Sequence, residues 1–327
     1  MYGCYACNPA LEVIPEVVVR RMKRSIILAC VLVLAVSVGL VLAGPVRAAF
    51  PGHNGPIAFG SYVPSGYQIL AVNPDGSGLR QVTPGTARCY EPNISPDGNT
   101  IVFVQSTTSG VEICATTTTG ADPQVLASGV VDDPSFSPKG RRLVFVRNDQ
   151  VWVMSADGSQ QRRLTRFGGH TRASSPFYSP NGKTIVFVAE VNIGRPSPKN
   201  RCAILAMNAD GSHLRRLAYT SQPNRTWIPP TSGVSFSPSG RTIIYGAQKY
   251  YKTGEVIRKM NADGTNQRNL RGSYGRGWPC FSPDGLQIVC LNRQGQLWVA
   301  RANGTHWRQL ITLSTFATEP YWGPQAR

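Results

Sequence analysis

A short motif recurs five times along the chain, and its repetition restricts the fold more than any other feature of the sequence. Each copy joins Ser-Pro-x-Gly to a run of β-branched and aromatic residues, as in NISPDGNTIVFV from Asn93. The motif serines are separated by steps of 42, 42, 58 and 45 residues. They are Ser95, Ser137, Ser179, Ser237 and Ser282. Self-similarity at this period is typical of β-propellers and other repeat folds.

A second motif alternates with the first and occurs six times. Its copies place Asp-Gly, or a weaker equivalent, between a strand-like run and a polar run, as in VWVMSADGSQQRRLT from Val151. Ser-Pro-x-Gly favours a β-turn, and Asp-Gly between such runs indicates a hairpin. Each unit therefore predicts four strands within about 40–45 residues, the size of one propeller blade.

The two ends of the repeat region complete each other. The segment from Ile57 has the second motif without a Ser-Pro-x-Gly strand before it, whereas EPYWGP from Glu319 matches EPNISP from Glu91. We therefore predict an all-β fold, a six-bladed β-propeller of four-stranded blades over residues 49–327. In this fold the C-terminal strand pairs into the N-terminal blade and closes the ring, which removes exposed sheet edges.

The FSPDG and NADG motifs resemble the WD40-like repeats of the TolB β-propeller family. The resemblance covers nearly all of residues 55–324, and spacing, turns and order recur together. It implies the propeller fold. We expect no counterpart of the α/β domain that precedes the propeller in TolB, so TolB's part in an envelope-spanning system is only an analogy.

Residues 1–48 are predicted to be an N-terminal extension and signal peptide. A basic cluster, Arg20 to Arg24, precedes an apolar run at residues 26–44, and Ala48 offers a cleavage site. Met22-Lys23-Arg24-Ser25 would be an ordinary signal-peptide start, which would make residues 1–21 an upstream mis-start from Met1 or a dispensable extension. An uncleaved membrane anchor is the alternative, because the run is near the minimum length for crossing a bilayer. Either way the propeller is predicted to be exported, periplasmic or extracellular.

Charge and cysteines leave several interpretations open. Residues 49–327 keep 29 basic and 15 acidic residues, a net charge of +14. This charge could favour anionic polymers, lipid surfaces or acidic proteins, or it is simply a solvated surface. Five cysteines remain in this region, an odd number. Cys280 and Cys290 flank one predicted hairpin and could face each other across it, or all five are plain buried side chains.

One position of the innermost strands predicts where a site lies. In ring order it is occupied by Glu319, Glu91, Asp133, Ser175, Gly233 and Trp278. The three carboxylates come from successive blades and should meet at one channel mouth, where they could hold a Ca²⁺-like metal ion or a basic group of a partner. Alternatively, they accept hydrogen bonds from backbone amides and stabilise the strand starts. Trp278 and Tyr321 are candidates for partner binding or for packing between blades.

Motifs of common enzymes are missing from the sequence. It contains no G-x-S-x-G, H-E-x-x-H, G-x-G-x-x-G or Walker pattern, and its four histidines are scattered singly. We therefore predict a monomeric, non-enzymatic binding scaffold that recognises an envelope or extracellular protein or glycan. It has no cofactor unless Ca²⁺ binds, no nucleic-acid partner, and membrane contact only through an uncleaved N-terminal segment. The alternative is a channel-centred metal-dependent hydrolase or lyase.

Overall fold

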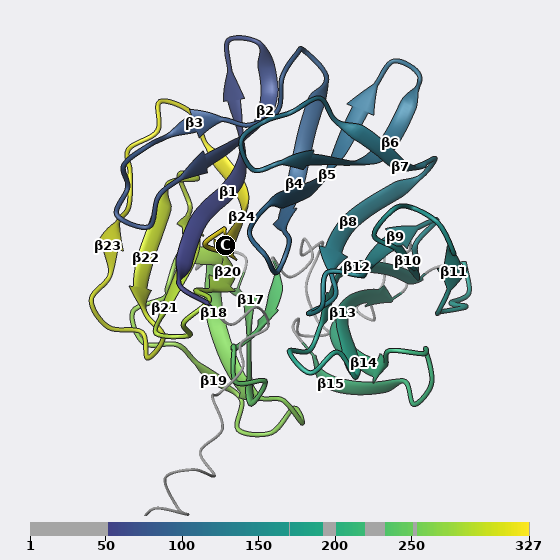
Figure 1. Cartoon of the computed structure of the whole chain (residues 1–327). Coiled ribbons are helices and arrows are strands. Elements are labelled where there is room, and N and C mark those ends of the chain that lie inside the picture. Colours follow the sequence, from purple (N-terminus) through teal and green to yellow (C-terminus); the bar gives the residue numbers. More distant parts are fainter. Residues whose placement is uncertain (1–51, 170, 192–200, 220–232, 251–253, 327) are drawn as a thin grey trace, which may run out of the picture. The chain divides into compact units, whose positions relative to one another are not determined.

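The computed structural model describes residues 52–169, 171–191, 201–219, 233–250 and 254–326. These residues form six four-stranded antiparallel sheets and no helix, so the predicted six-bladed β-propeller is confirmed. The innermost strand of each blade contacts the innermost strand of the next, from β24 through β20 and back to β24. Figure 1 follows the blades in chain order from purple to yellow.

Blade 1 combines the two ends of the repeat region, and blades 2 to 6 each use four consecutive strands. Blade 1 contains β24 (Ala317–Pro324), β1 (Asn54–Val63), β2 (Gly66–Val72) and β3 (Arg80–Gln81). Blades 2 and 3 contain β4 (Arg88–Ile94), β5 (Thr100–Thr107), β6 (Gly110–Thr117), β7 (Gln124–Ser128), β8 (Val131–Phe136), β9 (Arg142–Arg147), β10 (Gln150–Ser155) and β11 (Arg162–Arg163). Blades 4 to 6 contain β12 (Thr171–Tyr178), β13 (Thr184–Val191), β14 (Arg201–Asn208), β15 (Arg215–Tyr219), β16 (Val234–Phe236), β17 (Thr242–Tyr250), β18 (Gly254–Asn261), β19 (Arg268–Asn269), β20 (Arg276–Phe281), β21 (Gln287–Asn292), β22 (Leu297–Arg301) and β23 (Arg308–Gln309).

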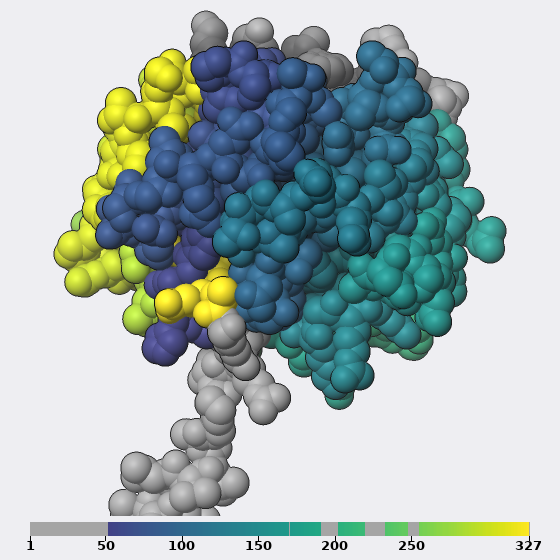
Figure 2. All heavy atoms as spheres, turned by 45° about the horizontal axis from the view of Figure 1, so that its top comes forward, coloured from purple at the N-terminus to yellow at the C-terminus, as the bar shows by residue number. Residues whose placement is uncertain are grey.

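The C-terminal strand closes the ring as predicted. In the pairing of β24 with β1, Tyr321 lies opposite Ala58 and Trp322 opposite Ile57. The backbone N–H of Gln325 also donates to the carbonyl of His53 over 2.9 Å. Figure 2 shows the last described residues, in yellow, lying against the first ones, in purple. The first and last strands of the described region are thus joined within one blade.

The second strand of each blade forms the core. In β5, Ile101 to Val104 have no exposed surface, and the same holds for Ile185 to Val188 in β13. Consecutive residues of a strand point to opposite faces, so both faces of these strands are covered. A blade stacked between two neighbours has this property, which explains why the repeat carries uninterrupted apolar runs instead of an alternating pattern.

The cysteines are buried thiols. The thiols of Cys89, Cys114, Cys280 and Cys290 are free, and all five cysteines of the described region are buried. Cys280 pairs with Val289, and Cys290 is the next residue along β21, so the two side chains point to opposite faces of the blade. The interpretation in which Cys280 and Cys290 face each other across the hairpin is therefore wrong, and the buried-thiol alternative is correct.

The predicted signal peptide or membrane anchor, residues 1–48, lies outside the described residues. Within the described ranges, no helix has the length and apolar character needed to cross a membrane.

Candidate functional site

A β-bulge interrupts the innermost strands. The register shifts there in β4, β8, β12, β20 and β24. The bulge residue has a φ near +50°, and in these five blades it is followed by proline, which has no N–H to donate to the ladder. The bulge residues are Glu91 (φ 55°), Asp133 (52°), Ser175 (47°), Trp278 (53°) and Glu319 (49°), and Gly233 (60°) occupies the same position before β16. These are the same six positions that alignment of the sequence repeats identified.

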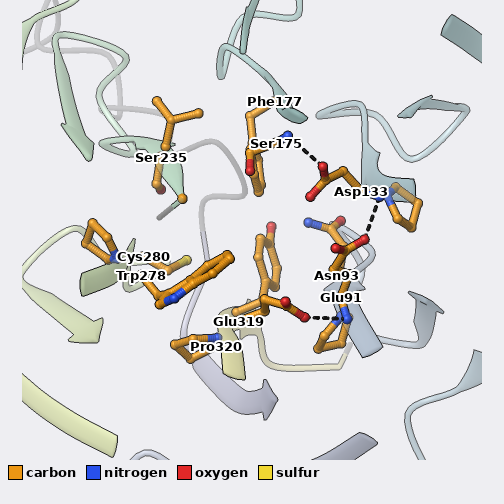
Figure 3. A pocket seen from close by; sticks show the side chains of 16 residues that line it. Glu91, Asn93, Asp133, Ser175, Phe177, Ser235, Trp278, Cys280, Glu319 and Pro320 are labelled. Carbon is orange, nitrogen blue, oxygen red and sulfur yellow. Dashed lines mark hydrogen bonds between the residues drawn. The ribbon is translucent and has the colours of Figure 1, made fainter. Parts of the chain in front are cut away.

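The bulge connects neighbouring blades through hydrogen bonds to carboxylates. The backbone N–H of Glu91 donates to Glu319 Oε2 over 2.9 Å, and that of Asp133 donates to Glu91 Oε2 over 2.6 Å. The N–H of Ser175 donates to Asp133 Oδ2 over 2.8 Å. Figure 3 shows these three bonds in series. One oxygen of each carboxylate therefore accepts a hydrogen bond from a backbone amide, which is the alternative role considered for these residues in the sequence.

All five residues singled out in the sequence line one small pocket. The cavity has a volume of about 60 Å³, and Glu91, Asp133, Glu319, Trp278 and Tyr321 all contribute to its wall. The side chains of Glu91, Asp133, Trp278 and Glu319 converge on it from four inner strands (Figure 3). The three carboxylates and Trp278 are partly exposed, whereas Tyr321 is buried. We call this cavity the acidic pocket.

An aromatic pair fills the channel below the acidic pocket. The ring of Tyr321 stacks on that of Phe177, with centroids 6.3 Å apart and planes 12° from parallel. Both residues also line a second, smaller cavity of about 30 Å³ deeper in the channel. Tyr321 therefore packs between blades while contributing to the wall of the acidic pocket, and Trp278 presents the more accessible ring.

The carboxylates of the acidic pocket are protonated more readily than ordinary ones. Burial raises the pKa of Asp133 to about 8, and repulsion from Asp132 adds to the shift. Burial likewise raises the pKa of Glu319 to about 7, although the hydrogen bond from the Glu91 amide opposes the change. The pKa of Glu91 lies well above its usual range because of burial and the neighbouring Asp133. A proton or another cation thus relieves an unfavourable concentration of negative charge.

Asp132 joins this cluster and was missed in the sequence. Ligand atoms of Glu91, Asp132 and Asp133 lie within 4.8 Å of one another. Asp132 Oδ1 is buried and has no hydrogen-bond partner among the described residues. In a regular strand, Asp132 and Asp133 would point to opposite faces, but a bulge between them and Ser135 changes the register. Two adjacent aspartates in the sequence were the available signal for this cluster. Without knowledge of the bulge, they could not be placed on the same side of the strand.

The chemistry of the acidic pocket suits cation binding better than nucleophilic catalysis. No Lys or Arg forms an ion pair with Glu91, Asp133 or Glu319 in the described part of the chain. Carboxylate oxygens are the ligands that Ca²⁺ and Mg²⁺ prefer, so Glu91, Asp132 and Asp133 fit such an ion. The pocket thiol, Cys280, has its pKa raised to about 11 by burial, which keeps it protonated and unreactive.

Comparisons with known proteins agree with this architecture. Residues 105–176 match a family model described as the dipeptidyl peptidase IV N-terminal region. A TolB homologue of Chlorobaculum tepidum is 30% identical over 107 residues, covering 31% of this chain and 25% of that protein. An uncharacterized peptidase of Bacillus subtilis, YuxL, is 25% identical over 215 residues, covering 61% of this chain and 28% of the peptidase. The matched stretches thus span about a quarter of each relative.

Solved structures show the same fold. The crystal structure of TolB from Acinetobacter baumannii superposes with a TM-score of 0.66 at 21% identity, covering 83% of this chain and 67% of that one. Six four-stranded blades and a C-terminal strand that closes the ring thus give this chain the β-propeller fold seen in the TolB structure.

Proposed function

We propose that the chain is a non-catalytic binding scaffold whose acidic pocket takes a positively charged group. The observation that carries this proposal is the convergence of Glu91, Asp133 and Glu319 on one cavity, with no basic side chain of the described ranges paired to them. Three buried or half-buried carboxylates with raised pKa values are stabilised by any cation that enters. The cation is a Ca²⁺-like metal ion or a basic group of a protein or glycan partner.

The surroundings of the pocket support a partner that also offers apolar surface. Trp278 is partly exposed at the wall, and aromatic side chains beside a charged pocket are favourable anchors for a partner. The leader-like residues 1–48 support export, so the proposed partner is an envelope or extracellular protein or glycan met by a monomeric propeller. Recovery of the mature protein without residues 1–48 from the periplasm or medium would test the export step.

Replacing Glu91 is expected to weaken cation binding at least tenfold. Glu91→Gln removes one charge but keeps an oxygen that can accept from the Asp133 amide, so the backbone link is preserved. We would titrate wild type and variant with CaCl₂ by calorimetry. Asp122→Asn is the matched control, because Asp122 is exposed and the substitution removes an equal charge away from the pocket. Equal Ca²⁺ affinity in wild type and Glu91→Gln would discard the metal site.

A partner's basic group is tested separately. Wild type, Glu91→Gln and Asp122→Asn would be used as affinity baits on the envelope fraction of the producing cell, with bound proteins and glycans quantified. Loss of one ligand with Glu91→Gln alone would support the acidic pocket as the binding site. The same ligand retained by all three baits would place recognition elsewhere on the propeller.

The second candidate function is a metal-dependent hydrolase or lyase, and the cluster of Glu91, Asp132 and Asp133 favours it. The similarity to a peptidase over part of the chain points the same way. A bound divalent ion would polarise the bond to be cleaved. Elemental analysis of purified protein and assays on peptide and polysaccharide substrates, with and without a chelator, separate this function from plain binding. Chelator-sensitive turnover that Asp132→Asn abolishes would establish the enzyme.

A further inference from the structure

Blade 6 departs from the repeat at an inward position. Two residues before the bulge, the four other blades in which this position is described carry small or apolar residues that are all buried. They are Cys89, Val131, Ala173 and Ala317. Blade 6 has Arg276 at this point, at the beginning of β20. A charge placed in an interblade layer is unfavourable unless it is compensated, so the exception requires a reason.

The Arg276 guanidinium is held in place without a carboxylate. It lies between two indole rings, 4.5 Å from the centroid of Trp298 and 4.6 Å from that of Trp307. Nη1 donates to the carbonyl of Gly272 over 2.9 Å, while Nε is buried and has no partner among the described residues. Cation–π contacts and the carbonyls of Gly272 and Tyr274 orient the group, but they leave its positive charge uncompensated.

A polar groove opens beside this guanidinium. Its volume is about 420 Å³, within the range usual for small-molecule sites, and it is lined by Tyr274, Gly275, Arg276, Asn292, Arg293 and Gln294. It shares no lining residue with the acidic pocket. Arg293 is exposed, and no carboxylate of the described residues forms an ion pair with it or with Arg276.

The other lining groups suit hydroxyl groups and a ring. Asn292 Oδ1 already accepts from the backbone N–H groups of Gln294 and Gln296, over 3.0 and 2.9 Å. This fixes the orientation of the Asn292 side chain, so that its amide NH₂ is the group left to donate. The Tyr274 ring is 55% exposed and offers an apolar surface against which a flat ligand can pack.

We propose that this groove binds an anionic sugar unit, a hexuronate or a sugar phosphate. Two guanidinium groups recognise the oxyanion, because planar N–H pairs match carboxylate and phosphate oxygens. Asn292 and Gln294 bond the hydroxyls, and Tyr274 packs on the sugar ring. An inorganic anion alone would leave most of the groove empty. The groove is independent of the acidic pocket, so failure to bind an anionic sugar would not argue against cation binding in the pocket, and the reverse also holds.

The test titrates the full-length protein with glucuronate, glucose 6-phosphate, inorganic phosphate and neutral glucose, up to about 10 mM, which detects millimolar affinities. We expect glucuronate, glucose 6-phosphate or both to bind more tightly than phosphate and glucose, with the preferred one identifying the oxyanion. Arg293→Gln should weaken binding about tenfold, and Tyr274→Ala should weaken the sugar ligands only. Arg301→Gln, an exposed arginine of β22 outside the groove, should change nothing.

Three results would overturn this site. They are no binding of either anionic sugar, binding of glucose as tight as that of the anionic sugars, or unchanged affinity in folded Arg293→Gln. Arg276→Lys provides a second measurement that keeps the charge but loses the planar fork. If Arg276→Lys is folded and binds as wild type does, the proposed recognition by Arg276 is wrong.

Discussion

Replacing Trp322 with alanine is expected to lower the free energy of unfolding by about 4 kcal/mol, the usual cost of removing a fully buried large aromatic side chain. Trp322 is 2% exposed and lies opposite Ile57 in the strand pair that closes the ring. Its Nε1 donates to the carbonyl of Gly55 over 3.1 Å, and its backbone N–H contacts Cys280 Sγ in blade 6 at 3.5 Å. The substitution therefore removes the indole and its hydrogen bond from blade 1, while the backbone contact with blade 6 is kept.

Urea unfolding followed by circular dichroism would measure this loss. Phe316→Ala is the control, because Phe316 immediately precedes β24 and is 49% exposed, so its truncation should cost about 1 kcal/mol or less. Trp322→Phe should fall between the two, since it keeps a ring but not the hydrogen bond. Equal losses in Trp322→Ala and Phe316→Ala would show that the closing strand contributes little to stability.

The ring closure was predictable because it depends on local signals that repeat. Ser95 illustrates this: its hydroxyl accepts from the Thr100 backbone N–H over 2.9 Å, and the N–H of Gly98 donates to the Ser95 carbonyl over 2.9 Å. A turn of this kind is specified by four adjacent residues. Once five copies fix the spacing, the match of EPYWGP to EPNISP places the tail in the first blade.

The convergence of Glu91, Asp133 and Glu319 was predictable for the same reason, since equivalent residues of equivalent strands must approach the same channel. The participation of Asp132 was not. The position of Asp132 depends on a bulge in which φ of Asp133 is 52°. Neither residue type nor spacing predicts that these two adjacent side chains lie on the same face. The repeat predicts where each backbone segment lies, whereas the β-bulge determines which side chains come into contact.

The position of Arg276 shows a further limit. Aligning the blades by their bulge residues identifies it as an exception, but its partners come from segments distant in the blade. Trp298 lies on β22 and Trp307 just before β23, and only the packed blade shows that both rings cover the guanidinium. The same applies to Cys280 and Cys290, whose separation follows from a register shift between Gly277 and Cys280.

Raising the pH from about 5 to about 8 is expected to destabilise the propeller by a few kcal/mol. The pKa of Asp133 is raised to about 8 and that of Glu319 to about 7, whereas both are near 4 in the unfolded chain. Between these values the native state holds more protons than the unfolded state. Stability is therefore fully present below the unfolded pKa and falls by up to about 1.4 kcal/mol per pH unit for each such group, until the pH passes the folded pKa.

Asp133→Asn is expected to flatten this pH dependence and to be more stable than wild type at about pH 8. The amide stays neutral throughout, and its oxygen can still accept from the Ser175 N–H, so the link to blade 4 is kept. Urea unfolding at several pH values would measure the slope, with Asp122→Asn expected to keep the slope of wild type. A slope unchanged by Asp133→Asn would show that Asp133 is ionised normally in the folded protein.

Calcium makes the same measurement decide between a proton and a metal ion in the acidic pocket. If Ca²⁺ binds the native state, it stabilises wild type by an amount that grows with the ratio of its concentration to its Kd. This gain should grow with pH as the carboxylates lose their protons, and should vanish near pH 5. It should also shrink in Asp133→Asn. If Ca²⁺ does not restore the stability that is lost as the pH rises, the remaining candidate for the cation in the pocket is a basic group of a partner.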